Sequence, residues 1–246
     1  MIAWRTLAPI LLALALPAAA QERASSSVPL PPPPSTTAPT WTGGEGWRLA
    51  PVVAVGAWRD GAAGDTQPAV TWGLEGEWRG ARHHAVLGAF QYGAYRRHVL
   101  TSPAGSTAVR ENDLGLRLAY AYEFLHHWSS SGRASGELLI GGFWRTFQNQ
   151  AAPASALGPL GGLRLGYRFA HPLDAGLETT YGFAASSKGS DCCVPGKPQG
   201  VVSTFASVGF RASSARLRVG YRSEVVILEH DYRIFDGLAL ILDLGL

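Results

Sequence analysis

The chain has 246 residues, of which 46% are hydrophobic, 10% aromatic and only 16% charged. Ordinary soluble proteins carry roughly 25% charged residues, and disordered chains are rich in charge and poor in aromatic rings. The composition therefore excludes a disordered chain or a coiled coil for the bulk of the protein. The formal net charge is +3, and no Arg or Lys cluster stands out that would indicate nucleic-acid binding.

The first 44 residues predict export. Arg5 precedes an apolar stretch over residues 7–16, and the small residues Ala18, Ala19 and Ala20 follow, as in a secretory signal peptide over residues 1–20 that is cut after Ala20. Residues 21–44 are rich in Pro and Ser, which neither pair as a strand nor continue a helix. We expect an extended periplasmic leader there, with a docking segment for a periplasmic partner as the alternative.

From residue 45 to residue 246 the dominant pattern is alternation with period two. Leu238, Leu240, Leu242 and Leu244 share one face of a strand because side chains at i and i+2 point the same way. The runs last about nine to thirteen residues, longer than the roughly 5–6 of a soluble strand and close to the 9–11 that cross a bilayer. About ten strands are predicted, at residues 47–58, 69–78, 84–97, 109–124, 134–147, 157–169, 174–185, 201–212, 216–227 and 234–246.

The composition of the two faces decides the architecture. One face holds Leu, Val, Phe, Tyr and Trp, and the other holds Gly, Ala, Ser, Arg and Glu. The first suits lipid and the second suits a barrel interior, and backbone groups in lipid must be paired by closing the sheet. The sequence predicts an all-β fold, a closed antiparallel up-and-down transmembrane β-barrel of about ten strands. A soluble lipocalin-like binding barrel, with the two faces reversed, is the alternative.

The links between strands support this layout. Short links at 79–82, 170–173 and 213–215 alternate with longer ones at 59–68, 148–156 and 186–200, as periplasmic turns alternate with extracellular loops in membrane barrels. Two links fit less well, because residues 125–133 are many for a turn and residues 228–233 are few for an outer loop. Aromatic residues are expected at both rims, with Trp58 and Trp72 among those of the outer rim.

The chain resembles the small outer-membrane β-barrel proteins of Gram-negative bacteria. Three features carry the resemblance: the end of the signal at Ala20, the alternation from Trp47 onward and the closing residues 237–246. The resemblance implies a location in the cell outer membrane, in contact with its lipid. Such barrels usually end in Phe or Trp, whereas this chain ends in Leu246. The active-site motifs of the omptins, which are ten-stranded outer-membrane proteases, find no match here.

Charged residues at inward positions are expected to pair across the lumen, because an unpaired buried charge is costly. A filled lumen points to a structural or surface-interaction protein, while a narrow pore for small solutes and a binding cavity are the alternatives. The expected lumen charges are Glu75, Glu77, Arg117, Glu123, Glu137, Arg145, Arg164, Arg168, Glu178, Arg211, Arg218, Arg222, Glu224 and Asp243.

A further alternative is a rim hydrolase acting on lipid or peptide, which would need a base and an orienting acid at the outer end. Glu229, His230 and Asp231 form the candidate constellation. The neighbouring loops are expected to add Asp60, Asp65, His98, Glu111, Asp113 and Asp191.

Adjacent histidines suggest metal ligands at first, but neighbours on a strand point to opposite faces. His126-His127 stands in a predicted turn, where the pair could bind an adventitious surface metal, but we expect no dedicated metal site at either pair, His83-His84 or His126-His127, and no cofactor. Cys192 and Cys193 lie in the predicted loop 186–200, where a vicinal disulfide, an intermolecular bridge and free thiols all remain open. This loop is the expected contact for an extracellular protein partner.

Overall fold

The computed structural model describes residues 46–61, 66–80, 83–102, 105–129, 132–149, 153–169, 172–189, 197–212, 215–229 and 231–245. Within the strands, the side chains of residues 96–102, 105–109, 128–129 and 149 are not described. The expected signal peptide, the expected leader, Cys192, Cys193 and Leu246 lie outside the described residues. No helix in the described ranges is both long and apolar enough to cross a membrane.

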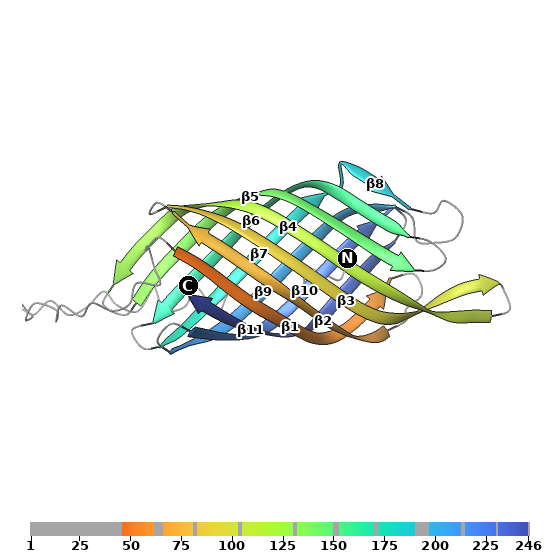
Figure 1. Cartoon of the computed structure of the whole chain (residues 1–246), viewed down its shortest axis with the longest axis horizontal. Helices are drawn as coiled ribbons and strands as arrows, with labels where there is room; N and C mark the ends of the chain where they lie inside the picture. Colours follow the sequence, from red (N-terminus) through yellow and green to blue (C-terminus); the bar gives the residue numbers. More distant parts are fainter. Residues whose placement is uncertain are drawn as a thin grey trace, which may run out of the picture. The chain divides into compact units, whose positions relative to one another are not determined.

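Ten long strands close into one antiparallel barrel, as predicted (Figure 1). Each long strand pairs with the next along the chain, and β1 pairs with β11 to close the sheet. The short β8 pairs with β6 beyond the end of β7, so it prolongs the β7 position. The strands are β1 (Gly46–Asp60), β2 (Thr66–Arg79), β3 (His84–Ser102), β4 (Gly105–Ser129), β5 (Gly132–Asn149), β6 (Ala154–Phe169), β7 (Leu173–Phe183), β8 (Ser186–Lys188), β9 (Pro198–Ala212), β10 (Ala215–Leu228) and β11 (Tyr232–Gly245).

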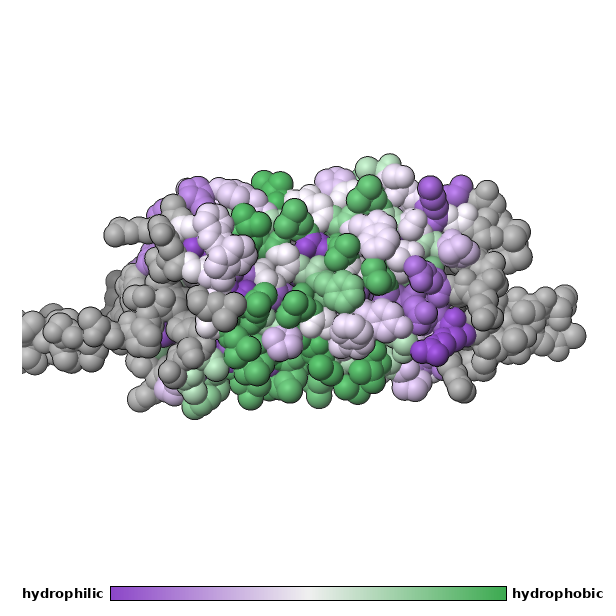
Figure 2. Space-filling model, viewed as in Figure 1, coloured by the Kyte–Doolittle hydropathy of each residue, from purple (hydrophilic) through white to green (hydrophobic). Residues whose placement is uncertain are grey.

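The large apolar side chains cover the outside of the barrel. Val55 and Leu238 face each other across the β1–β11 seam and are exposed, whereas Ala54 and Ala239, one position along, are buried inside. Figure 2 shows hydrophobic residues gathered in a band over the middle of the visible face, with more hydrophilic residues toward the ends. This arrangement is the reverse of a soluble barrel, so the lipocalin-like alternative is wrong.

The seam that closes the barrel brings two glycines face to face. Gly56 of β1 pairs with Gly237 of β11. A Cβ atom at Gly56 would overlap the backbone carbonyl oxygen of Asp236. The seam therefore needs a residue without a side chain here, which is where glycine serves a close backbone approach.

The two links that fitted the predicted layout poorly have structural explanations. β4 and β5 continue their pairing to Ser129 and Gly132, so most of residues 125–133 are strand and the turn is short. A bulge between Glu123 and Leu125 shifts the alternation in this segment. The link between β10 and β11 is a tight connection between Leu228 and Tyr232, closed by a hydrogen bond from Leu228 N to Asp231 O of 2.9 Å.

The expected place of Trp58 at the lipid-facing outer rim is wrong. Trp58 is only 3% exposed and its ring lies inside the barrel, 5.5 Å from that of Tyr95 and 5.6 Å from that of Phe235. The physical reason is the period of the strand, because Val53 and Val55 face outward and residues at even positions therefore face inward.

Candidate functional site

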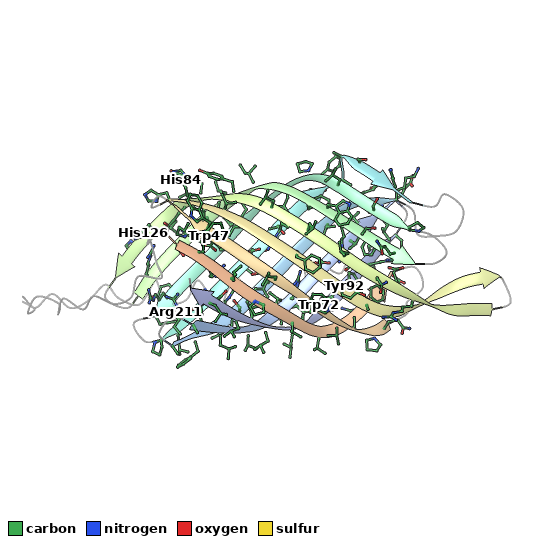
Figure 3. The ribbon with its side chains drawn as sticks, in the orientation of Figure 1. Trp47, Trp72, His84, Tyr92, His126 and Arg211 are labelled. Carbon is green, nitrogen blue, oxygen red and sulfur yellow. The ribbon has the colours of Figure 1, made fainter. Side chains whose placement is uncertain are left out.

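The lumen is the candidate site, and its two ends differ. We call the end that holds Gly46 and Gly245 the terminal end, and the end that holds the β1–β2, β3–β4, β5–β6, β8–β9 and β10–β11 links the loop end. In Figure 3, Trp47, His84, His126 and Arg211 lie at the terminal end, and Trp72 and Tyr92 lie nearer the loop end.

At the terminal end, one carboxylate joins opposite walls of the barrel. Glu77 of β2 accepts hydrogen bonds from Arg48 of β1 at 2.8 Å and from Arg164 of β6 at 3.1 Å. Arg79 donates to Glu77 at 3.0 Å and also pairs with Glu137 of β5, which contacts Arg164 at 3.1 Å. These bonds cross the lumen because β2 and β6 are not neighbours in the sheet.

A second group of ion pairs continues the terminal-end network around the wall. Asp243 of β11 is fully buried and accepts from Arg218 of β10 at 2.7 Å and 2.9 Å. Arg218 also reaches Glu75 of β2 at 3.5 Å, and Arg117 of β4 pairs with Glu178 of β7 at 2.7 Å. In this group, opposite charges from five strands therefore neutralise one another inside the barrel.

Toward the loop end, Arg145 of β5 holds two acids from different walls. Its Nε donates to Asp113 Oδ1 of β4 at 2.8 Å, and its guanidinium also pairs with Glu224 of β10. Arg222 donates to the same Glu224 at 3.3 Å and to Gln91 of β3. This cluster crosses the lumen as well, because β5 and β10 lie on different parts of the sheet.

The loop end of the lumen is filled by arginines packed against aromatic rings. Arg145 lies 5.5 Å from the ring centre of Trp58 and 5.1 Å from that of Phe147. Arg233 lies 5.2 Å from the same Phe147 ring, pairs with Glu111 and contacts Asp60 at 3.1 Å. Cation–π packing of this kind is strongest where water is excluded.

A cavity of about 80 Å³ lies between the two charged regions. At about 10–15 Å³ for each water, this is room for about five to eight water molecules. Its walls mix apolar and polar groups, and they include Val52, Thr71, Glu75, Gln91, Arg117, Phe143, Arg145, Leu160, Thr180, Val201, Ser203, Arg222 and Glu224.

Most of the charges expected in the lumen form ion pairs there. The structure joins these to opposite charges: Glu75, Glu77, Arg117, Glu123, Glu137, Arg145, Arg164, Glu178, Arg211, Arg218, Arg222, Glu224 and Asp243. Arg168 lies at the terminal end, where it faces Arg133 and Asp174 on the neighbouring strands. The sequence reasoning missed Arg48, Arg79, Glu111, Asp113, Arg133, Asp174, Arg216 and Arg233. Strand parity could have found Glu111 and Asp113, which share a face with Arg117.

Three of the acids expected around the rim constellation lie inside the barrel instead. Asp60 and Glu111 pair with Arg233, and Asp113 pairs with Arg145, all inside the barrel. The backbone of Glu229 bonds to Lys197 O at 3.0 Å. His230, Asp65, Asp191 and the side chain of His98 lie outside the described parts of the chain. The expectation that Glu111 and Asp113 belong to outer loops is wrong, because both are buried.

The paired histidines divide between the two faces of the sheet. The Nδ1 of His83 lies 3.8 Å from Glu123 and that of His126 lies 3.1 Å from the same carboxylate. His84 instead bonds to the hydroxyl of Tyr120 on the outer face. Within the residues that the structure covers, no group of three or more His, Cys, Asp or Glu is placed to hold a metal ion.

No family model matches the chain, and no curated protein does either. Among solved structures it is similar to the outer-membrane protease OmpT of Escherichia coli, with 10% identity over 81% of this chain and 97% of that one and a TM-score of 0.50. The β domain of the Bordetella autotransporter BrkA is 13% identical over 82% of this chain and 99% of that one, with a TM-score of 0.45. The likeness to OmpT is one of fold alone, and the chain has the fold of a bacterial outer-membrane β-barrel.

Proposed function

We propose that the protein is an outer-membrane barrel whose lumen is closed by ion pairs. We also propose that the barrel is a rigid scaffold for a two-stranded ribbon, made of the ends of β3 and β4 around residues 95–102 and 105–110, that contacts other molecules. The observation that carries the proposal is the set of ion pairs between facing walls, such as Glu77 of β2 with Arg164 of β6 and Arg145 of β5 with Glu224 of β10. Charges that satisfy one another across the lumen favour a closed barrel over an aqueous pore lined by free charge.

The outer surface supports contact with outer-membrane lipid. Trp47 and Trp78 pack together at the terminal end with ring centres 6.4 Å apart, and both rings are exposed. Tyr181 and Phe183 are exposed nearer the loop end. Aromatic rings at two levels, separated by an apolar band, match the girdles that mark the two interfaces of a membrane barrel.

The ribbon is formed by the ends of β3 and β4 that extend beyond the barrel wall. β2 pairs with β3 only as far as Ala94, and β5 pairs with β4 only as far as Glu111. β3 and β4 nevertheless remain paired with each other up to Ser102 and Gly105 (Figure 1). Among the described strands, none pairs with the outer edges of this ribbon. An open edge of a sheet can accept a strand from another chain.

Single-channel recording in planar bilayers tests the closed lumen. The wild-type chain should give no discrete conductance steps. A Glu77→Gln, Glu137→Gln double variant removes both acids that pair with Arg79 and two of the three that pair with Arg164, and it should produce openings. Arg59→Gln, which alters an exposed pair at the loop end, should stay silent. Regular steps from the wild-type barrel would instead favour a narrow pore for small solutes.

Trypsin treatment of intact cells tests the position of the ribbon. Arg96, Arg97 and Arg110 are the trypsin sites in or beside the ribbon. If the ribbon projects outside the cell, wild-type protein should be cut there, and replacing these three residues with Gln should abolish that cut. Cleavage at the ribbon only after the envelope is disrupted would place the loop end on the inner side and contradict the proposal.

A further inference from the structure

The cavity in the middle of the lumen has one wall of small residues. Gly73 of β2 and Gly115 of β4 line it, and they flank Gln91 of β3 in one row of the sheet. Among the described residues, a Cβ atom at Gly115 would meet only the Cβ of Gln91, at 3.9 Å. No close approach of two backbones therefore requires glycine at this position, and the missing side chain leaves the cavity open.

Another wall of the cavity is apolar. Phe143 of β5, Leu160 of β6 and Val201 of β9 line it, and they pack together in one hydrophobic cluster. A water molecule inside a protein needs about two to four polar partners, which this wall does not offer. Replacing poorly held water with an apolar group is favourable, so the wall suits a hydrocarbon.

Three hydroxyl groups line the same cavity. They belong to Thr71 of β2, Thr180 of β7 and Ser203 of β9, and Thr180 and Ser203 are cross-strand partners. Thr71 is only 1% exposed and Thr180 only 3% exposed. In the described part of the chain, no hydrogen bond joins either side chain to another residue. Because buried polar groups in proteins nearly always have a partner, these hydroxyls suit an occupant that can donate and accept hydrogen bonds.

The charged residues around the cavity indicate an uncharged occupant. Each has a partner of opposite charge: Glu75 with Arg218, Arg117 with Glu178, Arg145 with Asp113, and Arg222 with Glu224. A charged occupant would have to displace one of these partners or stay unpaired itself, and a buried charge without a partner is costly.

We propose that this cavity is a binding site for a small uncharged alcohol. The hydrocarbon body contacts Phe143 and Leu160, and the hydroxyl group exchanges hydrogen bonds with Thr180 and Ser203. The cavity of about 80 Å³ has room for about five to eight water molecules, so its occupant has about six non-hydrogen atoms. The inference goes beyond the scaffold function and does not depend on the ribbon.

Nuclear magnetic resonance of the full chain, refolded in detergent micelles with isotope-labelled threonine methyl groups, tests this site with n-pentanol as the probe. Thr71→Ser and Thr180→Ser variants identify the two cavity signals, because Ser lacks the methyl group. In the wild type both signals should shift saturably with n-pentanol. Thr179 and Thr204, which contact each other on the outer face, are the internal control for alcohol dissolved in the micelle and should not saturate. The alcohol is added both before and after refolding, so that a closed barrel cannot hide the site.

Two variants separate the cavity from other binding. Gly115→Leu places a side chain in the cavity and should abolish the saturable shifts. If gel migration shows that this variant is not folded, Gly115→Ala replaces it and should weaken binding severalfold. Thr180→Val keeps the shape and removes one hydroxyl, so binding read at the Thr71 methyl should weaken about two- to tenfold.

Three results would overturn the proposal. The first is the absence of a saturable shift in the wild type under either order of addition. The second is an unchanged shift in a folded Gly115→Leu variant, because the alcohol would then bind elsewhere. The third is tighter binding of glycerol than of n-pentanol, because the occupant would then be a polar solute without a hydrocarbon body.

Discussion

Replacing Arg145 with Met tests whether the lumen charges hold the barrel together. Arg145 is 5% exposed, bonds to Asp113 at 2.8 Å, pairs with Glu224 and lies over the rings of Trp58 and Phe147. Met has a similar length and keeps the apolar contact with the rings. The substitution therefore removes the cation while changing the packing little.

The size of the expected loss of stability depends on the two carboxylates, Asp113 and Glu224, that stay buried after Arg145 is replaced. Each hydrogen bond to a charged group contributes roughly 1.5–3 kcal/mol. These contributions do not simply add, because the carboxylates left behind can relax or take up protons. Removing one partner of a buried ion pair costs about 3–5 kcal/mol, since the other charge stays buried. Arg145→Met should therefore lower the free energy of unfolding by about 4 kcal/mol.

Urea unfolding in phosphatidylcholine vesicles, followed by gel migration, gives the free energies. A triple variant of Arg145→Met, Asp113→Asn and Glu224→Gln leaves no isolated charge and should recover most of the loss. Arg59→Met is the control, because Arg59 has a side chain 54% exposed and pairs at the surface, so it should lose less than about 1 kcal/mol. A loss below about 1 kcal/mol for Arg145→Met would show that the lumen charges are hydrated and refute the reasoning.

The same vesicle assay checks three other predictions. Ile140→Arg, at the 70% exposed middle of β5, should cost about 2–4 kcal/mol if this face meets hydrocarbon, and no effect would contradict the lipid-facing orientation. Trp58→Ala should cost about 3–5 kcal/mol because the ring is buried in the lumen, whereas a rim residue would lose little. Gly56→Ala should reduce the fraction of heat-modifiable barrel, since its Cβ overlaps Asp236, and normal assembly would show that the β1–β11 seam adapts.

The barrel itself was predictable because two independent signals agree in each strand. The alternation of Leu238, Leu240 and Leu242 with Ala239 and Ile241 fixes which residues share a face, and the length of the runs indicates a bilayer. The β11 strand that follows from this pattern pairs with both β10 and β1. Side-chain parity is a local property, so one strand carries enough information to place its own side chains.

The predicted positions of Glu111 and Asp113 are wrong because β4 extends further than the strand that the sequence predicts. The sequence predicts a loop at Glu111 and Asp113 because they stand near the start of the strand expected at 109–124, whereas β4 begins earlier, at Gly105. Outside the bilayer two strands can remain paired without an apolar face, so alternation gives no signal for their ends. Trp58 differs, because its place near a strand end favours an aromatic girdle whereas its parity puts the ring inside the barrel, where the structure has it.

The partners within the lumen could not be deduced from the sequence, because they depend on the diameter and stagger of the closed sheet. Arg164 contacts Glu77, Glu137 and Glu178, which come from three other strands. A planar guanidinium can serve several carboxylates in this way, whereas a Lys ammonium is a point charge with strong hydration. This difference explains why the chain uses so little lysine. Its two lysines are residues 188 and 197, and every cation in the described lumen ion pairs is Arg or His. The choice of cation thus follows from the same requirement as the fold, which is to satisfy many buried carboxylates within one narrow cylinder.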